Sequence, residues 1–194
     1  IVQAPLPPGR DVVFVPTAGL SSVYANDGGI VIADFIDMTK KRPLSFELDH
    51  RLALHTGMED VFSPELNDEL EHLILSKKVP YSGRAIYCCT EGPRFETAAE
   101  IQMYKMLGGH LVGMTSVPEV VLARELGMCY ASICLVTNFA AGITTGILTH
   151  SEVLEVMASS LTSVRGIILT ALKYLPSERV CDCAKSIPEA GIFK

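Results

Sequence analysis

Residues 90–142 read TEGPRFETAAEIQMYKMLGGHLVGMTSVPEVVLARELGMCYASICLVTNFAAG. Three segments of this stretch place polar residues after an apolar run or a Gly/Pro turn and before a helix-like sequence. They are the loop 91–96 and the strand ends 112–116 and 135–138. Ligands of open α/β sheets bind beyond the carboxyl ends of the strands. We therefore expect Glu96, Thr115 and Asn138 to lie near one pocket, provided that their strands are neighbours.

Strand-like and helix-like segments alternate along the whole chain. Apolar runs predict strands over 11–16, 30–36, 84–89, 111–114 and 130–136. Apolar residues at helical spacing, with stop and start signals at the ends, predict helices over 64–77, 97–107, 118–126 and 150–175. This alternation favours an α/β fold with a largely parallel sheet. Since no repeat or linker interrupts it, we expect one domain over residues 1–194.

Small residues follow the first predicted strand. Thr17, Ala18 and Gly19 are read as a turn, because the apolar run ends at Pro16. Small side chains at a strand end let backbone N–H groups approach an anion or a sugar. A plain tight turn explains the same residues equally well, so the sequence alone leaves both interpretations open.

The composition excludes several classes of protein. With 48% hydrophobic and 20% charged residues, the chain is too apolar for disorder. A net charge of −6 gives no general attraction to nucleic acid or acidic membranes. No apolar run reaches the roughly 20 residues of a membrane helix, and the N-terminal residues do not resemble a signal peptide. The expectation is a soluble, cytoplasmic protein.

The six cysteines do not form the pattern of a disulfide-rich domain. Cys88, Cys129 and Cys134 lie in apolar runs and are expected to be small core residues. Cys181 and Cys183 form a Cys-x-Cys pair in a polar tail. A tetrahedral zinc site needs two more ligands than this pair supplies, so we expect no metal site.

Several runs together resemble the trimeric purine nucleoside phosphorylase and methylthioadenosine phosphorylase family. They are DFID at 34–37 with Thr39 and Arg42-Pro43, GPRFET at 92–97 with Ala99-Glu100, GMTSVPE at 113–119, and Thr137-Asn138. The resemblance runs from about Asp11 to the end and is closest to members that act on 6-oxopurines. It implies a three-layer sandwich around a central mixed, largely parallel sheet, and a homotrimer.

The same resemblance implies an activity. Members of this family are pentosyltransferases that transfer the pentose of a purine nucleoside to phosphate, reversibly, releasing the free base and pentose 1-phosphate in purine salvage. Negative charge builds on the departing purine while the sugar becomes cation-like, so catalysis needs hydrogen-bond donors at the purine and a held phosphate. No metal or organic cofactor is implied, and inorganic phosphate is the co-substrate.

Two residues carry the expected base recognition. Asn138 matches the residue that contacts N7 and the 6-substituent of the purine. An amide both donates and accepts, which suits a 6-oxopurine such as that of inosine or guanosine, whereas adenine-specific relatives have Asp there. Glu96 matches the acid that holds N1–H of the base, where adenine-specific relatives have Ser.

Other positions match further contacts of the family. The resemblance implies that substrate-binding residues are Phe95, Met114, Thr115, Phe139, Ala140, His150 and His55, the last lent by a neighbouring subunit. It implies that phosphate is bound by Thr17, Ala18 and Thr115. His150 near the 5′ group favours a 5′-hydroxyl, because methylthio-specific members carry an apolar residue there.

The chain also departs from the family pattern. The Gly-rich phosphate loop near the family's N-terminus and its Arg-His pair have no counterpart in these residues. We therefore expect the N-terminal phosphate-loop segment to be missing from this sequence. The alternatives are a methylthioadenosine or methylthioinosine phosphorylase, a relative that binds nucleosides without turnover, and an α/β assembly subunit.

Each residue also has an interpretation without function. Glu96 could cap the helix that follows it, and Phe95 and Met114 could be core residues. Asn138 could form a turn, and His150 could simply start a helix. The functional interpretation therefore depends on the motifs together and not on any single residue.

Overall fold

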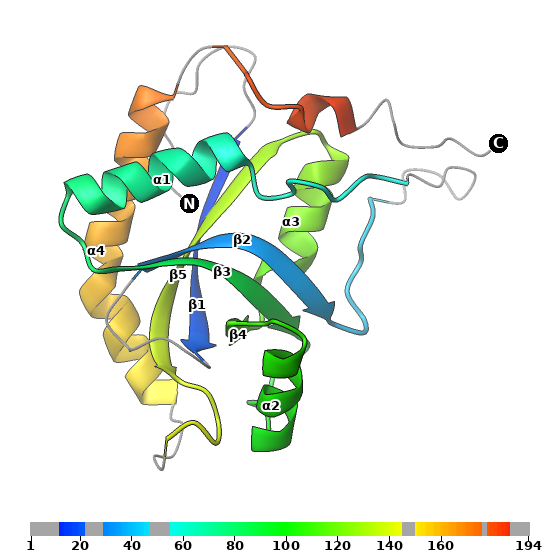
Figure 1. The fold of residues 1–194 in the computed structure, drawn as a ribbon, viewed down its shortest axis with the longest axis vertical. Helices are drawn as coiled ribbons and strands as arrows, with labels where there is room; N and C mark the ends of the chain where they lie inside the picture. Colours follow the sequence, from blue (N-terminus) through cyan, green and yellow to red (C-terminus); the bar gives the residue numbers. More distant parts are fainter. Residues whose placement is uncertain (1–11, 22–28, 47–54, 145–149, 176–177, 187–194) are drawn as a thin grey trace.

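The structure is a computed structural model that describes residues 12–21, 29–46, 55–144, 150–175 and 178–186. Its strands are β1 (Val12–Ser21), β2 (Gly29–Met38), β3 (Tyr81–Thr90), β4 (Leu111–Gly113) and β5 (Cys129–Phe139). Its helices are α1 (Pro64–Ser76), α2 (Ala98–Met106), α3 (Ser116–Glu125) and α4 (His150–Tyr174), followed by the short 3-10 helix η1 (Cys183–Lys185). The order of elements agrees with the predicted α/β class (Figure 1).

The five strands form one mixed sheet in the order β1-β4-β3-β2-β5, and β5 pairs again with β1. The pairs β1–β5, β2–β3 and β3–β4 are parallel, whereas β1–β4 and β2–β5 are antiparallel. The sheet is therefore mixed and largely parallel, as predicted. It closes on itself into a barrel, however, so the structure does not confirm the detail of a three-layer sandwich.

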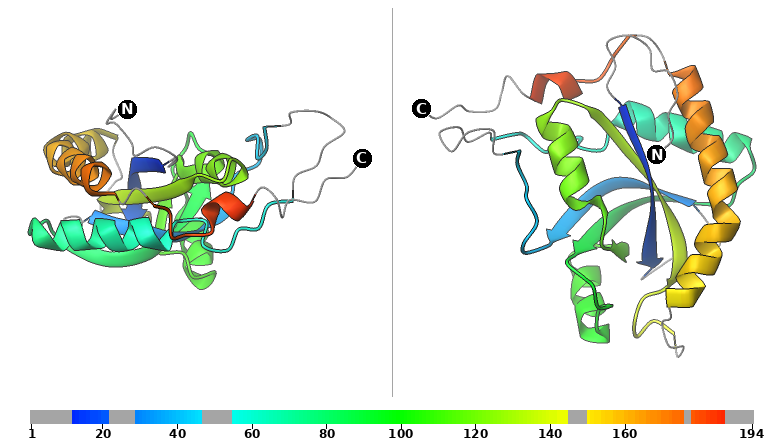
Figure 2. Two further views of the ribbon diagram at one scale, coloured as in Figure 1. Left: turned by 90° about the horizontal axis from the view of Figure 1, so that it is seen from above. Right: turned by 180° about the vertical axis from the view of Figure 1, so that it is seen from behind.

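Alternate residues of β5 enter two hydrophobic clusters. Ala131 and Ile133 pack with α1 and α4, whereas Tyr130 and Cys134 pack with α3, β2 and β3. Since successive side chains of a strand point to opposite faces, β5 is buried on both of its faces. Two views show α3 and α4 at opposite sides of the strands, with α1 meeting α4 (Figures 1 and 2).

The first strand is longer than predicted. Thr17, Ala18 and Gly19 lie inside β1, which continues to Ser21, so the prediction of a turn at these residues is wrong. A proline is tolerated in a strand where its nitrogen need not donate to a neighbour. Pro16 pairs with Ile133 of β5 on one side, and on the other side β1 pairs with β4 only at Leu20 and Ser21. A glycine fits position 19 because a Cβ there would lie 2.7 Å from Cys134 Sγ.

The predicted helices are confirmed within a few residues. The regular part of α3 begins at Pro118, since Val117 has the extended angles φ −109° and ψ 129°. The stretch Leu154–Tyr174 of α4 is long and apolar enough to span a membrane by length and composition alone. This differs from the expectation that no such run exists. One face of α4, however, carries residues such as Ile168 that are buried against α1 and β5.

Candidate functional site

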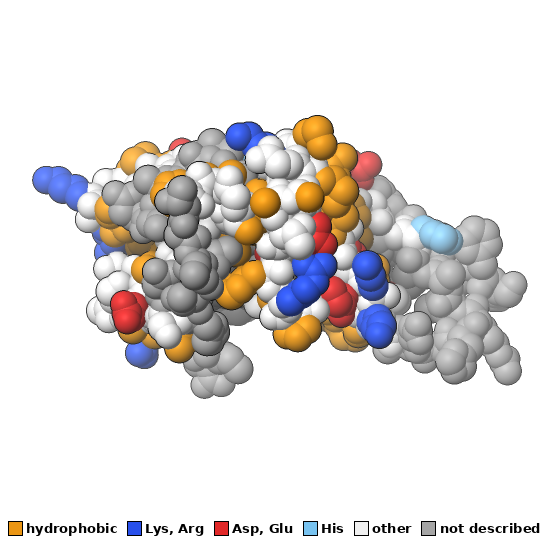
Figure 3. Space-filling model, turned by 90° about the horizontal axis from the view of Figure 1, so that it is seen from below, with side chains coloured by type: hydrophobic (Ala, Val, Ile, Leu, Met, Phe, Trp, Pro, Cys, Tyr) orange, Lys and Arg blue, Asp and Glu red, His pale blue; other side chains and the backbone are white. Residues whose placement is uncertain are grey.

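The ends of β1, β4 and β5 meet in one part of the molecule. Leu20 of β1 pairs with Asn138 of β5 on one side and with Val112 of β4 on the other. The next residue of β4, Gly113, pairs with Cys89, one residue before the end of β3. The three predicted site segments therefore follow strands that converge near α2 (Figure 1). Charged side chains of both signs are interspersed with hydrophobic ones where this end of the molecule is described (Figure 3).

Asn138 lies in the penultimate position of β5 and is only 6% exposed. The backbone N–H of Ala140 donates to the carbonyl oxygen of Ser21 at 2.8 Å. This bond fixes the chain just beyond Asn138 against the end of β1. Asn138 is therefore part of an ordered strand end, and not of the turn that its residue type alone would suggest.

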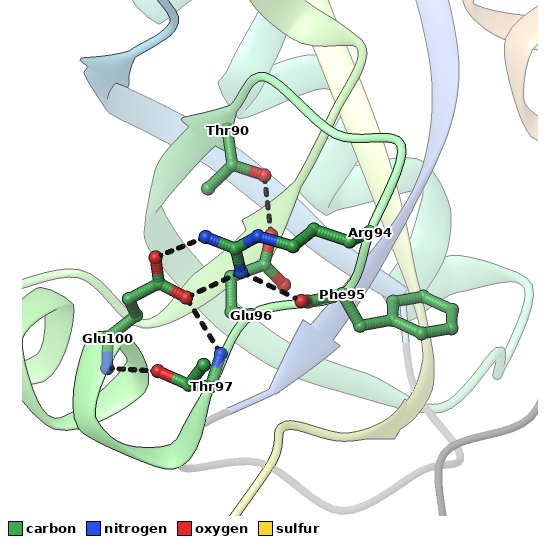
Figure 4. A network of polar contacts seen from close by, with 6 residues as sticks. All are labelled: Thr90, Arg94, Phe95, Glu96, Thr97 and Glu100. Carbon is green, nitrogen blue, oxygen red and sulfur yellow. Dashed lines mark hydrogen bonds and ion pairs between the residues drawn. The ribbon is translucent and has the colours of Figure 1, made fainter.

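Glu96 is a buried carboxylate, 7% exposed, at the end of the loop after β3. The hydroxyl of Thr90 donates to Glu96 Oε1 at 2.6 Å, and the same hydroxyl lies 3.3 Å from the carbonyl oxygen of Gly113 (Figure 4). Buried carboxylates need such partners. Thr90 therefore holds the Glu96 side chain between the ends of β3 and β4.

Another acid caps the helix that follows Glu96. Thr97 is the N-cap of α2, and Glu100 completes a capping box with it through bonds of 2.8 and 3.2 Å. Arg94 forms a two-pronged ion pair with Glu100, with distances of 2.7 and 2.8 Å. These hydrogen bonds, chiefly from Arg94, lower the pKa of Glu100 to about 2. The capping interpretation of Glu96 is therefore wrong, because Thr97 and Glu100 fill that role (Figure 4).

The segments that carry Glu96 and Asn138 pack together. Ala140 belongs to a buried cluster with Leu20 and Val112, and Phe95 packs against the same cluster. In Figure 4 the Phe95 ring points away from the Arg94–Glu100 pair. Beyond Asn138, Gly142 approaches α2 so closely that a Cβ on it would lie 2.6 Å from Ala98 Cβ. The loop after β5 thus lies against the start of α2, next to Glu96.

Met114 packs over the loop after β3. Gly92 in this loop has φ +68°, a conformation that glycine adopts without strain. A Cβ on Gly92 would also lie 2.6 Å from Met114 Sδ. The structure thus brings Met114 to the same loop as Glu96, and its predicted contact with a sugar stays a prediction.

Two predicted phosphate ligands are direct neighbours. The hydroxyl oxygens of Thr17 and Thr115 lie 2.6 Å apart, although the residues are far apart in the chain. Thr17 is buried, whereas Thr115 is exposed and can reach a ligand. The bond brings the two residues together, even though Thr17 lies inside a strand, and their contact with phosphate stays a prediction.

Tyr87 of β3 is a buried neighbour of the candidate site that the sequence did not indicate. Burial raises its pKa to about 12, opposed by hydrogen bonds with Thr115 and Thr17. Its hydroxyl therefore stays protonated at neutral pH and extends the pair into a group of three hydroxyls. The sequence offers no signal for this role, because Tyr87 reads as an ordinary aromatic residue of a buried strand.

Arg42 connects three parts of the site. Its guanidinium donates to the carbonyl oxygens of Thr90 and Glu91, each at 3.1 Å, and to the carbonyl oxygen of Val117. Arginine suits this task because it presents several donors in a fixed plane. It positions the end of β3 relative to the start of α3. The family-like Arg42-Pro43 run was the only sequence signal for this role.

The structure does not bring the remaining predicted site residues into contact with Glu96, or it does not describe their side chains. His55 is exposed and lines a cavity of about 440 Å³ beside Val121 and Glu125 of α3, apart from Glu96 in this chain. That His55 contributes to the substrate site of a neighbouring subunit stays a prediction. Phe139 ends β5, Ala18 lies in β1, and His150 begins α4. The side chains of Ala18 and His150 lie outside the described part, so their predicted contacts are untested.

Comparison with known proteins identifies the family of the chain. A sequence model of the phosphorylase superfamily matches residues 10–173, and the chain belongs to this family. Among individual relatives, it is 41% identical over 186 residues to the 6-oxopurine nucleoside phosphorylase of Pyrococcus furiosus, covering 92% of this chain and 70% of that protein. It is 44% identical over 159 residues to a probable S-methyl-5′-thioinosine phosphorylase of Methanocaldococcus jannaschii, covering 82% and 62%.

Solved structures give the same family. A double mutant of adenosine/methylthioadenosine phosphorylase from Schistosoma mansoni, in complex with adenine, superposes with a TM-score of 0.83. The two sequences are 27% identical, and the superposition covers 93% of this chain and 72% of the other. A methylthioadenosine phosphorylase from an antarctic soil metagenomic library gives a TM-score of 0.79, with 26% identity and coverages of 92% and 64%. The chain is thus a member of an enzyme family that includes the nucleoside phosphorylases, which are pentosyltransferases.

Proposed function

We propose that this protein catalyses the reversible phosphorolysis of 6-oxopurine nucleosides, such as inosine and guanosine, to the free base and pentose 1-phosphate. The observation that carries the proposal is the convergence of two buried polar side chains, Asn138 and Glu96, on neighbouring segments at one end of the strands. In the proposed complex the purine edge occupies the space between them.

The chemistry of the two side chains suits a 6-oxopurine. The amide of Asn138 can donate to an oxygen at position 6 or to N7 as negative charge develops there. Glu96, as a carboxylate, accepts from the N1–H that a 6-oxopurine carries and a 6-aminopurine lacks. The names of the cited curated relatives agree, because inosine and thioinosine share the base hypoxanthine, a 6-oxopurine.

The hydroxyl of Thr115 is the proposed contact for phosphate, because Thr115 is exposed. The buried hydroxyls of Thr17 and Tyr87 lie behind it and would position it. Hydroxyls can donate to phosphate oxygens but carry no charge, so a phosphate dianion needs further donors. The curated relatives are longer than this chain, which spans 70% of one and 60% of another. We therefore propose that the additional donors belong to the phosphate-loop segment that the family resemblance implies.

A second substrate is supported by the relatives. Some are named 6-oxopurine nucleoside phosphorylase and others S-methyl-5′-thioinosine phosphorylase, which differ at the 5′ position of the sugar and not in the base. We prefer the 5′-hydroxyl because His150 is polar, and keep methylthioinosine as the alternative. Cytoplasmic location, a homotrimer and the absence of a cofactor remain part of the proposal.

A direct assay tests the proposed function. The full-length protein is incubated with inosine, methylthioinosine or adenosine, with and without phosphate, and the released base is measured. We expect phosphate-dependent release of hypoxanthine, faster from inosine than from methylthioinosine. Exclusive release of adenine would refute the base assignment. Binding of hypoxanthine in calorimetry without turnover would instead indicate a non-catalytic relative.

Thr115→Val tests the phosphate contact. Losing one hydrogen bond costs about 1 kcal/mol or slightly more, so we expect the KM for phosphate to rise about tenfold while the KM for inosine changes little. Thr170→Val is the matched control, because the Thr170 hydroxyl only bonds to the carbonyl of Gly166 within α4, at 2.7 Å. An equal rise in both KM values after Thr115→Val would argue against a phosphate contact.

A further inference from the structure

Three cysteines meet at the end of the molecule opposite to the proposed nucleoside site. The sulfurs of Cys129, Cys181 and Cys183 all lie within 4.8 Å of one another, and those of Cys129 and Cys181 are 3.3 Å apart. Cys129 begins β5, nine residues before Asn138. At about 3.3 Å per residue of strand, the cluster lies about 30 Å from the base-reading residues. It therefore takes no part in the proposed reaction.

The tail that carries two of these cysteines is held in place. Arg179 donates to the carbonyl oxygen of Gly127 at 2.8 Å, in the turn between α3 and β5. The hydroxyl of Ser186 is 2.8 Å from the carbonyl oxygen of Arg124 and 2.9 Å from that of Cys183. Contacts on both sides of the Cys-x-Cys pair thus fix it against the start of β5. The fold brings Cys129, which its apolar run marks only as a core residue, beside this pair as the third sulfur.

The cluster borders an accessible cavity. Cys181 and Cys183 line a cavity of about 520 Å³ beside the C-terminal tail. Charged residues in its lining are Glu59, Asp60, Glu65, Asp182, Arg124 and Lys185. Four carboxylates against two basic groups favour a cation over an anion. Cys129 and Cys183 are buried, whereas Cys181 is partly exposed, so an ion has a route to the sulfurs from the cavity.

We propose that Cys129, Cys181 and Cys183 form a binding site for a thiophilic metal cation, Zn²⁺ or Cu⁺. Thiolate ligands select these metals. A zinc–sulfur bond of about 2.3 Å in tetrahedral geometry separates the sulfurs by about 3.8 Å, which lies within the spacing of the cluster. The three thiols lose their protons to solvent on binding. Three sulfurs from the protein leave a fourth position of a tetrahedral ion directed toward the cavity.

The site has a structural consequence. A bound cation would join the C-terminal tail to the first residue of β5, and would thereby add to the bonds of Arg179 and Ser186. Because a ligand that binds only the folded state stabilises it, the cation should raise the temperature of unfolding. The effect should weaken as the pH falls, since protons compete for the thiolates.

The test uses the full-length protein, purified under reducing conditions and freed of metal. Zn²⁺ and Cu⁺ are titrated against a chromophoric chelator, and Co²⁺ serves as a spectroscopic probe of sulfur ligation. We expect one ion per chain and sulfur-to-cobalt charge-transfer absorption. Cys181→Ser should weaken binding by more than about 100-fold, because even changes beyond the ligands cost 10–100-fold. Cys88→Ala, which removes a buried thiol elsewhere, is the control and should leave the affinity unchanged.

Several results would overturn the proposal. Equal affinity in wild type and Cys181→Ser would show that the ion binds elsewhere. Failure of the reduced protein to bind any of the three metals would exclude the site. If mass spectrometry finds a disulfide between Cys129 and Cys181 that persists under the reducing conditions, the cluster is a covalent link and not a metal site. None of these results bears on the nucleoside assay, so the two proposals fail independently.

Discussion

Asn138→Asp is expected to lower the preference for inosine over adenosine, measured as the ratio of kcat/KM values, by about 100-fold. An Asp carboxylate only accepts hydrogen bonds. It would therefore replace the donor at the oxygen of a 6-oxopurine by an acceptor, so that two acceptors face each other. A buried mismatch of this kind costs about 1–3 kcal/mol. The carboxylate can instead accept from the amino group of adenine, so the two substrates change in opposite directions.

A matched control separates this effect from general damage. Asn67 is also a buried asparagine, and its amide donates to the carbonyl oxygen of Ile32 at 3.1 Å, far from the site in the contact between α1 and β2. Asn67→Asp should therefore lower stability without changing the substrate ratio. If Asn138→Asp leaves the ratio as it is in wild type, Asn138 does not read the base.

Glu96→Gln is expected to lower kcat/KM for inosine by roughly 10- to 100-fold. The hydrogen bond from N1–H loses the charge of its acceptor, and hydrogen bonds to charged groups contribute about 1.5–3 kcal/mol. The amide oxygen of Gln can still accept from Thr90, so the local structure should persist. Steady-state kinetics with inosine, together with the unfolding temperature of each variant, measures the effect.

Glu125→Gln is the control for this substitution. Glu125 has the same exposure as Glu96, 7%, and accepts from the hydroxyl of Ser45 at 2.7 Å and from the backbone of Phe46 at 2.9 Å. It lies at the end of α3, in the cavity that His55 lines and not beside Glu96. A loss of activity in Glu125→Gln as large as in Glu96→Gln would mean that burying any neutralised carboxylate damages this protein, and that Glu96 has no special role.

Local signals in the sequence predicted the helices and most of the strands. Pro64 at the start of α1 and the capping residues of α2 act within one turn, so their effect can be read from neighbouring residues. The prediction failed where a distant strand decides the outcome. Gly19 reads as a turn residue, yet its lack of a side chain serves the close approach of Cys134 on β5.

The site was predicted only in part for the same reason. The motifs indicated Glu96, Asn138 and Thr115, because each follows a recognisable strand or turn. Tyr87 and Cys129 carry no such signal, since their roles depend on which residues the fold brings beside them. Sequence patterns report what a segment does locally, whereas a constellation of side chains is a property of the tertiary structure.

Pro16 has a consequence for the behaviour of the protein at high concentration. Over most of its length β1 pairs with β5, and it meets β4 only at Leu20 and Ser21. Although the sheet closes through β1, the part of this strand before Leu20 has no partner on the β4 side among the described residues. The strand of another molecule could add at such a place and start a fibril. An imino acid halfway along it interrupts any continuous ladder of donors. We therefore expect the same residue that made this strand look short in the sequence to hinder the addition of a further strand.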